Sequence, residues 1–186
     1  MNESREAALI QRCQVGDTEA FRTLVEQYRS VLFGTAYLMI RDRGLAEDAV
    51  QEALIQIWKN LASFRLKSSV KTWMVRIVVN EVKQQFRKKK LTMISLEETN
   101  DAPKESDGVE STLIHDEERR ILRQALYRLP PEQKEAVVLR YFSELTVPEI
   151  AAVTNQREGT IKARLSRALD RLNEILGRDG MWEVRR

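Results

Sequence analysis

The chain has 186 residues, 42% hydrophobic and 32% charged, and its single cysteine and single histidine leave no intrachain disulfide and no ordinary zinc site. Residues 1–90 carry 16 Lys/Arg and 10 Asp/Glu, residues 91–118 carry 1 and 9, and residues 119–186 carry 14 and 9, so two basic segments that favour a polyanionic partner flank an acidic strip. Since the chain shows no signal-peptide pattern, membrane-spanning run or catalytic cluster, we expect a cytoplasmic protein that is not an enzyme and needs no metal or cofactor.

Residues 2–40 predict two helices. The first covers residues 2–15 and ends at Gly16, and Asp17 is placed to cap the second. Cys13 is expected to be a small apolar core residue. Apolar residues at helical spacing predict a buried stripe on the second helix, made of Phe21, Leu24, Val25, Tyr28, Leu32, Ala36 and Ile40. Residues 41–44 interrupt this stripe.

Residues 45–62 have the most regular helical pattern in the chain. The expected core face consists of Ala46, Ala49, Val50, Ala53, Leu54, Ile57, Trp58 and Leu61. The opposite face holds Asp48, Gln51, Glu52, Gln56 and Lys59, with Ile55 among them. An isoleucine framed by carboxylates is either an ordinary exposed side chain or a protein-contact point, and the pattern leaves both open.

A helix is expected from residue 70 or 71 to about residue 89, after a loop at 64–69. Most of its side chains are apolar, Trp73 and Phe86 included, and are expected in the core. Its polar residues gather in one narrow stripe: Thr72, Arg76, Asn80, Lys83 and Arg87. This stripe, followed by three lysines, is either a nucleic-acid contact or the solvent-facing edge of a core helix.

Residues 91–111 show no sustained period and many acids, which predicts a flexible linker. Helical spacing returns at 112–129, where His115 is expected to be a solvated residue near the helix start rather than a catalytic base. Pro131 then begins another helix, in which four residues are expected to face inward: Val137, Val138, Tyr141 and Phe142.

Residues 144–176 predict a helix, a short turn and a second helix. Thr146 and Glu149 have capping-box spacing, with Pro148 in the first turn. The second helix is expected to end at Gly177 and to bury Ile161, Leu165, Ala168, Leu169, Leu172 and Leu176. Its other side carries Thr160, Ala163, Arg164, Arg167 and Arg171. Three arginines on one exposed face suit a recognition helix in the DNA major groove; an ordinary solvated face is the alternative.

These patterns contain no strand-period segment and predict an all-α chain: two small helical domains, at 1–90 and 112–180, joined by the acidic linker at 91–111. The order of the motifs resembles the extracytoplasmic-function (ECF) bacterial sigma factors of the sigma-70 superfamily. AEDAVQEALIQIW at 46–58 and KTWMVRIVVNEVKQQFRKKK at 71–90 are similar to region 2 of that family. LPPEQKEAVVLRYFSELTVPEIA at 129–151 and EGTIKARLSRALDRL at 158–172 resemble its region-4 helix-turn-helix. Departures are the turn VTNQREGT, Glu144 where the family often has glycine, and Ser166 where it commonly has a larger residue.

The resemblance implies an alternative sigma factor that binds core RNA polymerase, recognises the −35 and −10 promoter elements and starts transcription of a specific regulon. The implied partners are the β′ clamp helices and β flap of core polymerase, promoter DNA and an anti-sigma factor, and the free protein is expected to be a monomer. Core binding is assigned to Asp48, Gln51, Glu52, Ile55 and Gln56, and the −10 element to Thr72, Arg76, Asn80, Lys83 and Arg87. The −35 element is assigned to Thr160, Lys162, Arg164, Ser166, Arg167 and Arg171. The resemblance also makes the 65–71 loop a pocket for a flipped base.

Two other functions compete with this one. A stand-alone helix-turn-helix regulator would use its N-terminal half for sensing or dimerisation, but such a domain has no need of the basic helix at 71–90. A protein-only adaptor would leave both basic segments merely solvated, and nucleic-acid binding without salt dependence would favour it.

Overall fold

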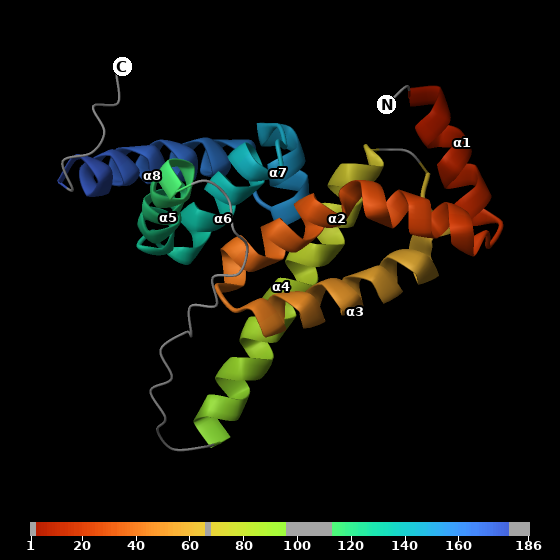
Figure 1. Cartoon of the computed structure of the whole chain (residues 1–186), viewed down its shortest axis with the longest axis horizontal. Helices are drawn as coiled ribbons and strands as arrows, with labels where there is room; N and C mark the ends of the chain where they lie inside the picture. The colour runs from red at the N-terminus through yellow and green to blue at the C-terminus, as the bar shows by residue number, and fades with distance from the viewer. Residues whose placement is uncertain (1–2, 66–67, 96–112, 179–186) are drawn as a thin grey trace. The chain divides into compact units, whose positions relative to one another are not determined.

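The computed structural model describes residues 3–65, 68–95 and 113–178, with side chains at 5–65, 68–88 and 118–177 (Figure 1). All regular structure in these ranges is helical, and the chain divides into two compact units, residues 1–100 and 101–186. None of the helices in these ranges is long and apolar enough to cross a membrane. The side chain of His115 and most of the expected linker lie outside the described residues.

The N-terminal unit is built from four helices: α1 (Glu3–Gln14), α2 (Thr18–Ile40), α3 (Arg43–Leu61) and α4 (Val70–Ser95). Helices α2, α3 and α4 all pack against one another, and α1 packs on α2 and α3. Fully buried apolar side chains fill the space between them, the largest being Leu24, Leu32, Ile57, Leu61, Met74, Val70, Val75 and Val78. Burial of these side chains is the main stabilising term of the unit.

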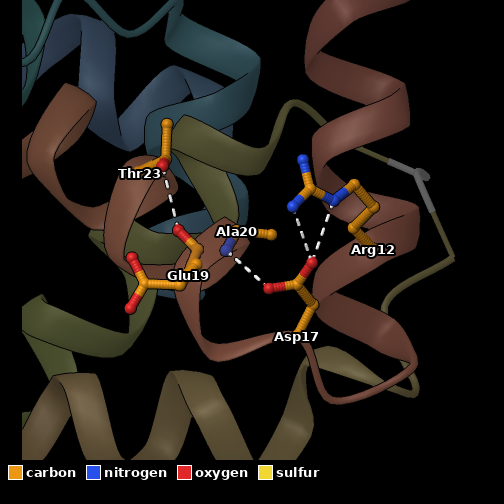
Figure 2. A network of polar contacts seen from close by, with 5 residues as sticks. All are labelled: Arg12, Asp17, Glu19, Ala20 and Thr23. Carbon is orange, nitrogen blue, oxygen red and sulfur yellow. Dashed lines mark hydrogen bonds and ion pairs between the residues drawn. The ribbon is translucent and has the colours of Figure 1, made fainter.

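The turn between α1 and α2 is held by several polar contacts (Figure 2). Gly16 adopts φ +89°, which a residue with a side chain rarely does. Asp17 caps α2 by accepting a hydrogen bond from the N–H of Ala20 at 2.9 Å, and its other carboxylate oxygen pairs with Arg12 at 2.7 Å. These contacts confirm the expected cap at Asp17, and the first helix ends before Gly16 as expected. Cys13 is buried, as expected of a core residue.

The expected break after α2 is confirmed at Arg41 and Asp42, although α3 already begins at Arg43, with Asp42 as its cap. Three other expectations for the N-terminal unit are corrected. Trp58 was expected on the core face of α3 and is 36% exposed. Phe86 is 44% exposed rather than buried, and the last buried side chain described on α4 is that of Val82, one turn earlier. Helix α4 itself continues to Ser95, past the expected end near residue 89.

The C-terminal unit contains α5 (Leu113–Tyr127), α6 (Pro131–Val137), the π-helical segment η1 (Val138–Phe142), α7 (Val147–Thr154) and α8 (Glu158–Arg178). Helix α8 is the centre of this unit, because α5, α6 and α7 all pack against it. Its core consists of Leu139, Leu145, Ile150, Ile161 and Ala168 with further apolar residues around them.

The expected helix-turn-helix is present as α7, a short turn and α8. Thr146 and Glu149 form the capping box, with the Glu149 carboxylate accepting from the Thr146 N–H at 2.8 Å, and Pro148 lies in the first turn. Asn155 ends α7 in the left-handed conformation, and its N–H donates to the carbonyl of Ala151. The N–H of Gln156 donates to the same carbonyl at 3.0 Å, so the end of α7 is closed without a glycine.

Three expectations for the C-terminal unit are wrong. Tyr141 and Phe142 are 57% and 41% exposed, whereas Val137 and Val138 are buried as expected. The cause is the π-helical segment, because its wider turn breaks the 100° spacing on which the inward face was predicted. Leu169 is exposed at the edge of the α8 core face, and Gly177 lies within α8 rather than ending it.

Candidate nucleic-acid and protein interfaces

Helix α3 presents an acidic and amide-bearing face with one apolar side chain in it. Asp48, Gln51 and Glu52 are exposed, Gln56 is half-buried, and Ile55 is 46% exposed among them. The opposite face buries Ala46, Ala49, Ala53, Ile57 and Leu61 against α2 and α4. The small alanines let the helices approach closely, so α3 is a rigid support for its exposed face.

Helix α4 is enclosed on most of its sides as far as Val82, yet it exposes a narrow polar stripe. Arg76, Asn80 and Arg87 are exposed and Lys83 is half-buried, whereas Met74, Val75, Val78, Val79 and Val82 on its other sides are fully buried. The cationic groups and the amide are therefore held on one line by a helix that cannot rotate without opening the core. Such a line is able to follow a nucleic-acid backbone and to place an amide at a base edge.

Thr72 does not share the exposure that the stripe pattern predicted. It is 4% exposed, and its hydroxyl lies 2.7 Å from the Ser69 hydroxyl, which in turn accepts the Thr72 N–H at 3.1 Å. Ser69 thus caps α4, and Thr72 supports that cap from inside the first turn. A helical wheel places Thr72 in the stripe because it gives the angular position of a residue around the helix axis. It does not show which residues cover the end of the helix.

Trp73 lies beside the stripe and packs on the end of the preceding loop. Its ring centroid is 4.8 Å from that of Phe64, which is buried, and Trp73 itself is half-buried. The expected core role of Trp73 therefore holds for only part of its surface. Residues 66 and 67 of the loop expected to hold a flipped base lie outside the described residues.

The exposed side of α8 brings together the residues expected to read the −35 element. Lys162, Ser166, Arg167 and Arg171 are exposed, whereas Thr160 and Arg164 are half-buried at the edge of the core face. Arg167 folds back along the helix, with Nε donating to the carbonyl of Ala163 at 3.1 Å. At 100° per residue, Lys162 and Ser166 occupy the flank opposite to Arg164 and Arg171, so the polar set wraps the solvent-facing side.

The helical spacing of apolar residues did not predict that several apolar side chains would be exposed. Phe86 on α4, Tyr141 and Phe142 on η1 and Leu122 on α5 are each more than two-fifths exposed. A wheel that counts only apolar spacing places such residues in a core. No metal-binding group of His, Cys, Asp or Glu occurs in the described ranges.

Both units of the chain are similar to known proteins. Residues 24–92 match the family model of Sigma-70 region 2, and residues 119–172 match that of Sigma-70, region 4. The ECF RNA polymerase sigma-E factor of Escherichia coli K12 is 32% identical over 174 residues, covering 89% of this chain and 91% of the relative. The chain belongs to the ECF RNA polymerase sigma factor family.

Further relatives extend this result across the chain. The RNA polymerase sigma-H factor of Pseudomonas aeruginosa is 29% identical over 185 residues, covering 95% of this sigma factor and 96% of the relative. SigW of Bacillus subtilis, also an ECF sigma factor, is 30% identical over 183 residues, with 90% and 94% covered. Because both regions match, the chain is an alternative sigma factor, and the stand-alone regulator is not favoured.

Solved structures agree with this fold. The sigma factor RpoE in complex with the anti-sigma factor NepR from Bartonella quintana superposes with a TM-score of 0.73 at 29% identity, covering 84% of this chain and 96% of that one. CnrH in complex with the cytosolic domain of CnrY gives a TM-score of 0.69 at 21% identity, covering 92% and 97%, and supports the fold alone.

Proposed function

We propose that this alternative sigma factor binds core RNA polymerase through the exposed face of α3, with Ile55 as its apolar centre. The observation that supports this most directly is a half-exposed isoleucine set among Asp48, Gln51 and Glu52 on a helix whose other face is fully packed. Apolar anchors ringed by polar groups are typical of binding hot spots. The β′ clamp helices are the partner that the family resemblance assigns to this face.

The polar stripe of α4 is proposed to read and open the −10 element. Arg76 and Arg87 supply charge for the phosphates, and Asn80 supplies an amide that can pair with an exposed base edge. Lys83 belongs to the same line, and Thr72 acts from beneath by supporting the Ser69 cap. Strand opening costs a few kcal/mol per extruded base, which contacts to the single strand offset.

Helix α8 is proposed to read the −35 element through Lys162, Arg164, Ser166, Arg167 and Arg171, with Thr160 at its start. Replacing Arg167 with alanine should weaken use of the −35 element by about 1–3 kcal/mol, the value of a good base contact. Glu174→Gln, on an exposed part of the same helix further from its start, is the matched control. Unfolding of Arg167→Ala in circular dichroism would show that the residue is structural instead.

The further partners proposed are the β flap of core polymerase and an anti-sigma factor. The Bartonella quintana structure shows a related sigma factor held by an anti-sigma factor, which supports an equivalent partner for this chain. We place the protein in the bacterial cytoplasm as a free monomer, because core polymerase and promoter DNA are there.

Two sets of variants separate polymerase binding from promoter opening. Ile55→Glu adds a charge beside Asp48 and Glu52 and should abolish core binding, since losing a buried interface anchor typically costs about 2 kcal/mol or more. Arg76→Ala and Asn80→Ala should keep core binding and lose opening of the −10 element. A pull-down with core polymerase and a permanganate footprint of the promoter measure the two steps.

The controls for this experiment lie on the same two helices. Asn60→Glu adds the same charge to α3 at an exposed position outside the acidic face, and Gln84→Ala removes an exposed amide of α4 beside the stripe. Both should behave as the wild type. Normal transcription by Ile55→Glu would refute the assignment of core binding to α3. Normal opening by both Arg76→Ala and Asn80→Ala would show that the polar stripe is only the solvent-exposed side of a core helix.

A further inference from the structure

Gln14 ends α1 and connects it to the segment that follows α3. Its side-chain Nε2 donates to the carbonyl oxygen of Phe64 at 2.8 Å and to that of Leu61 at 3.3 Å. The carbonyl of Phe64 lies beyond the end of α3, so it has no partner within that helix. Both bonds are partly shielded from water, which strengthens them relative to bonds on the surface.

The turn that carries Gln14 is itself fixed on both sides. Arg12 pairs with Asp17 across the turn (Figure 2). The N–H groups of Val15 and Asp17 donate to the carbonyl of Arg12, and Cys13 is buried. A side chain that projects from such a turn has little freedom to move. The Gln14 side chain is therefore a rigid link, called the Gln14 strut below, between the end of α1 and the carbonyls of Leu61 and Phe64.

Phe64 passes this constraint to α4. Its ring packs on Trp73, which lies in the first turn of α4 and three residues before Arg76 in the polar stripe. The contacts thus run from α1 through Gln14 and Phe64 to the start of the helix proposed to open promoter DNA.

We infer that Gln14 is a positioning residue for promoter opening, which sets the place of the N-terminal end of α4 relative to α1. This inference rests on the proposed function of α4. Apolar packing is not directional and tolerates small shifts, whereas two hydrogen bonds from one amide nitrogen fix both distance and angle. A reading surface has to be held within about 0.5 Å of its productive geometry, so loss of the strut should impair opening before it impairs folding.

The test replaces Gln14 with methionine, which has nearly the same length but no donor. Reconstituted holoenzyme carrying Gln14→Met should open promoter DNA on the order of tenfold less, because the Phe64 carbonyl loses this donor and the Leu61 carbonyl keeps only the N–H of Phe64. Core binding should stay unchanged, since the α3 face is untouched. Gln11→Met, at an exposed position one turn earlier on α1, is the matched control and should open as the wild type does.

A second control separates positioning from stability. Ala36→Gly weakens the buried part of α2 and leaves the side chains of Gln14, Phe64 and Trp73 in place. It should lower the melting temperature while leaving opening unchanged. In chains that keep Trp73 as the sole tryptophan, through Trp58→Phe and Trp182→Phe, Gln14→Met should raise quenching of Trp73 by acrylamide and Ala36→Gly should not. All measurements are made at a temperature where unfolding curves show each variant folded.

The outcomes divide clearly. Normal opening by Gln14→Met, an equal loss in Ala36→Gly, or loss of core binding in Gln14→Met would each overturn the inference. Arg76→Ala and Asn80→Ala, run in the same assay, test the proposed function separately. If they lower opening and Gln14→Met does not, only the inference fails; if they open normally, the proposed role of α4 fails and the inference with it.

Discussion

Asp17 shows how one side chain can settle a helix start and a turn together. Its carboxylate accepts the N–H of Ala20 and pairs with Arg12. The Ala20 N–H, and after it the Arg12 guanidinium, lower the pKa of Asp17 below its ordinary value of 3.8. A carboxyl group whose pKa is lowered by folding stabilises the folded state while it is ionised. Its contribution is complete above about pH 4 and is lost as the pH falls through the lowered pKa.

This linkage predicts the behaviour of two variants at Asp17. Asp17→Asn keeps an oxygen that can cap α2 but has no charge to lose, so its melting temperature should fall less than that of the wild type between pH 7 and pH 3. Asp17→Ala should be less stable than both at neutral pH, because it has no cap at all. Thermal unfolding followed by circular dichroism at several pH values measures these differences. An equal acid sensitivity in the wild type and Asp17→Asn would contradict the role of the charge.

At the element scale, the turn after η1 holds Glu144 in a left-handed backbone conformation that glutamate rarely adopts. Glu144 adopts φ 57°, and the N–H of Leu145 donates to the carbonyl of Leu139 at 3.0 Å. A Schellman helix end has a similar bond, but there it spans five residues, whereas here it spans six at the end of the wider π-helical turn. In both cases the residue before the donor is left-handed, a position most often taken by glycine. Leu145 next to it is fully buried, and Arg140 donates to the carbonyl of Leu145 at 3.0 Å. The buried leucine and the arginine hold the turn in place, so Glu144 keeps the strained conformation.

Glu144→Gly should therefore stabilise the C-terminal unit by about 0.5–1 kcal/mol, the strain of a left-handed residue less the entropy cost of glycine. Asn155→Gly is the matched control, since it has nearly the same conformation at φ 54° but asparagine accepts that region well. Denaturant unfolding of the two variants should show a gain for the first and little change for the second. A loss of stability in Glu144→Gly would mean that contacts of the Glu144 side chain outweigh the strain.

Helix starts and turns could be predicted from the sequence because their chemistry is local. The Asp17 cap and the Thr146–Glu149 capping box each involve residues three apart and are formed as expected. The exposure of Tyr141 and Phe142 could not be predicted, because a π-helical turn changes the angular spacing without a sequence signal.

Burial at a helix end depends on neighbours that a periodic pattern does not contain. Thr72 fits the polar stripe by angle and is nevertheless buried, with its hydroxyl in contact with that of Ser69. Phe86 fits the apolar face by angle and is nevertheless exposed. The contacts of Gln14 with Leu61 and Phe64 join residues 47 and 50 positions apart, and no spacing rule reaches that far.

At the scale of the whole molecule, the protein consists of two compact units that match two different regions of the sigma-70 family. The two proposed DNA-reading surfaces should bind more tightly together than either alone, because the first contact raises the effective concentration of the second. The acidic composition of the predicted linker should keep that segment away from the phosphates. The connection is thus expected to matter through its length and charge rather than through contacts.

The division into domains predicts a specific pattern of limited proteolysis. A glutamate-specific protease has four glutamate sites in the predicted linker after α4, Glu97, Glu98, Glu105 and Glu110, and should cut there first. Glutamates within helices, such as Glu47 and Glu174, should resist until denaturant is added. Mass spectrometry of the early products should show two stable fragments, and equally fast cutting at Glu47 or Glu174 would contradict the split.

The cut protein also tests whether the connection is needed. The fragment with α1–α4 should still bind core polymerase, because the proposed α3 face is intact. Transcription from a promoter that depends on its −35 element should nevertheless fall strongly, since the two surfaces no longer share one effective concentration. Raising the concentration of the C-terminal fragment should restore part of the activity if that account is correct. If the cut protein transcribes as well as the intact chain at low concentration, the two units are held together by direct contacts and not by the linker.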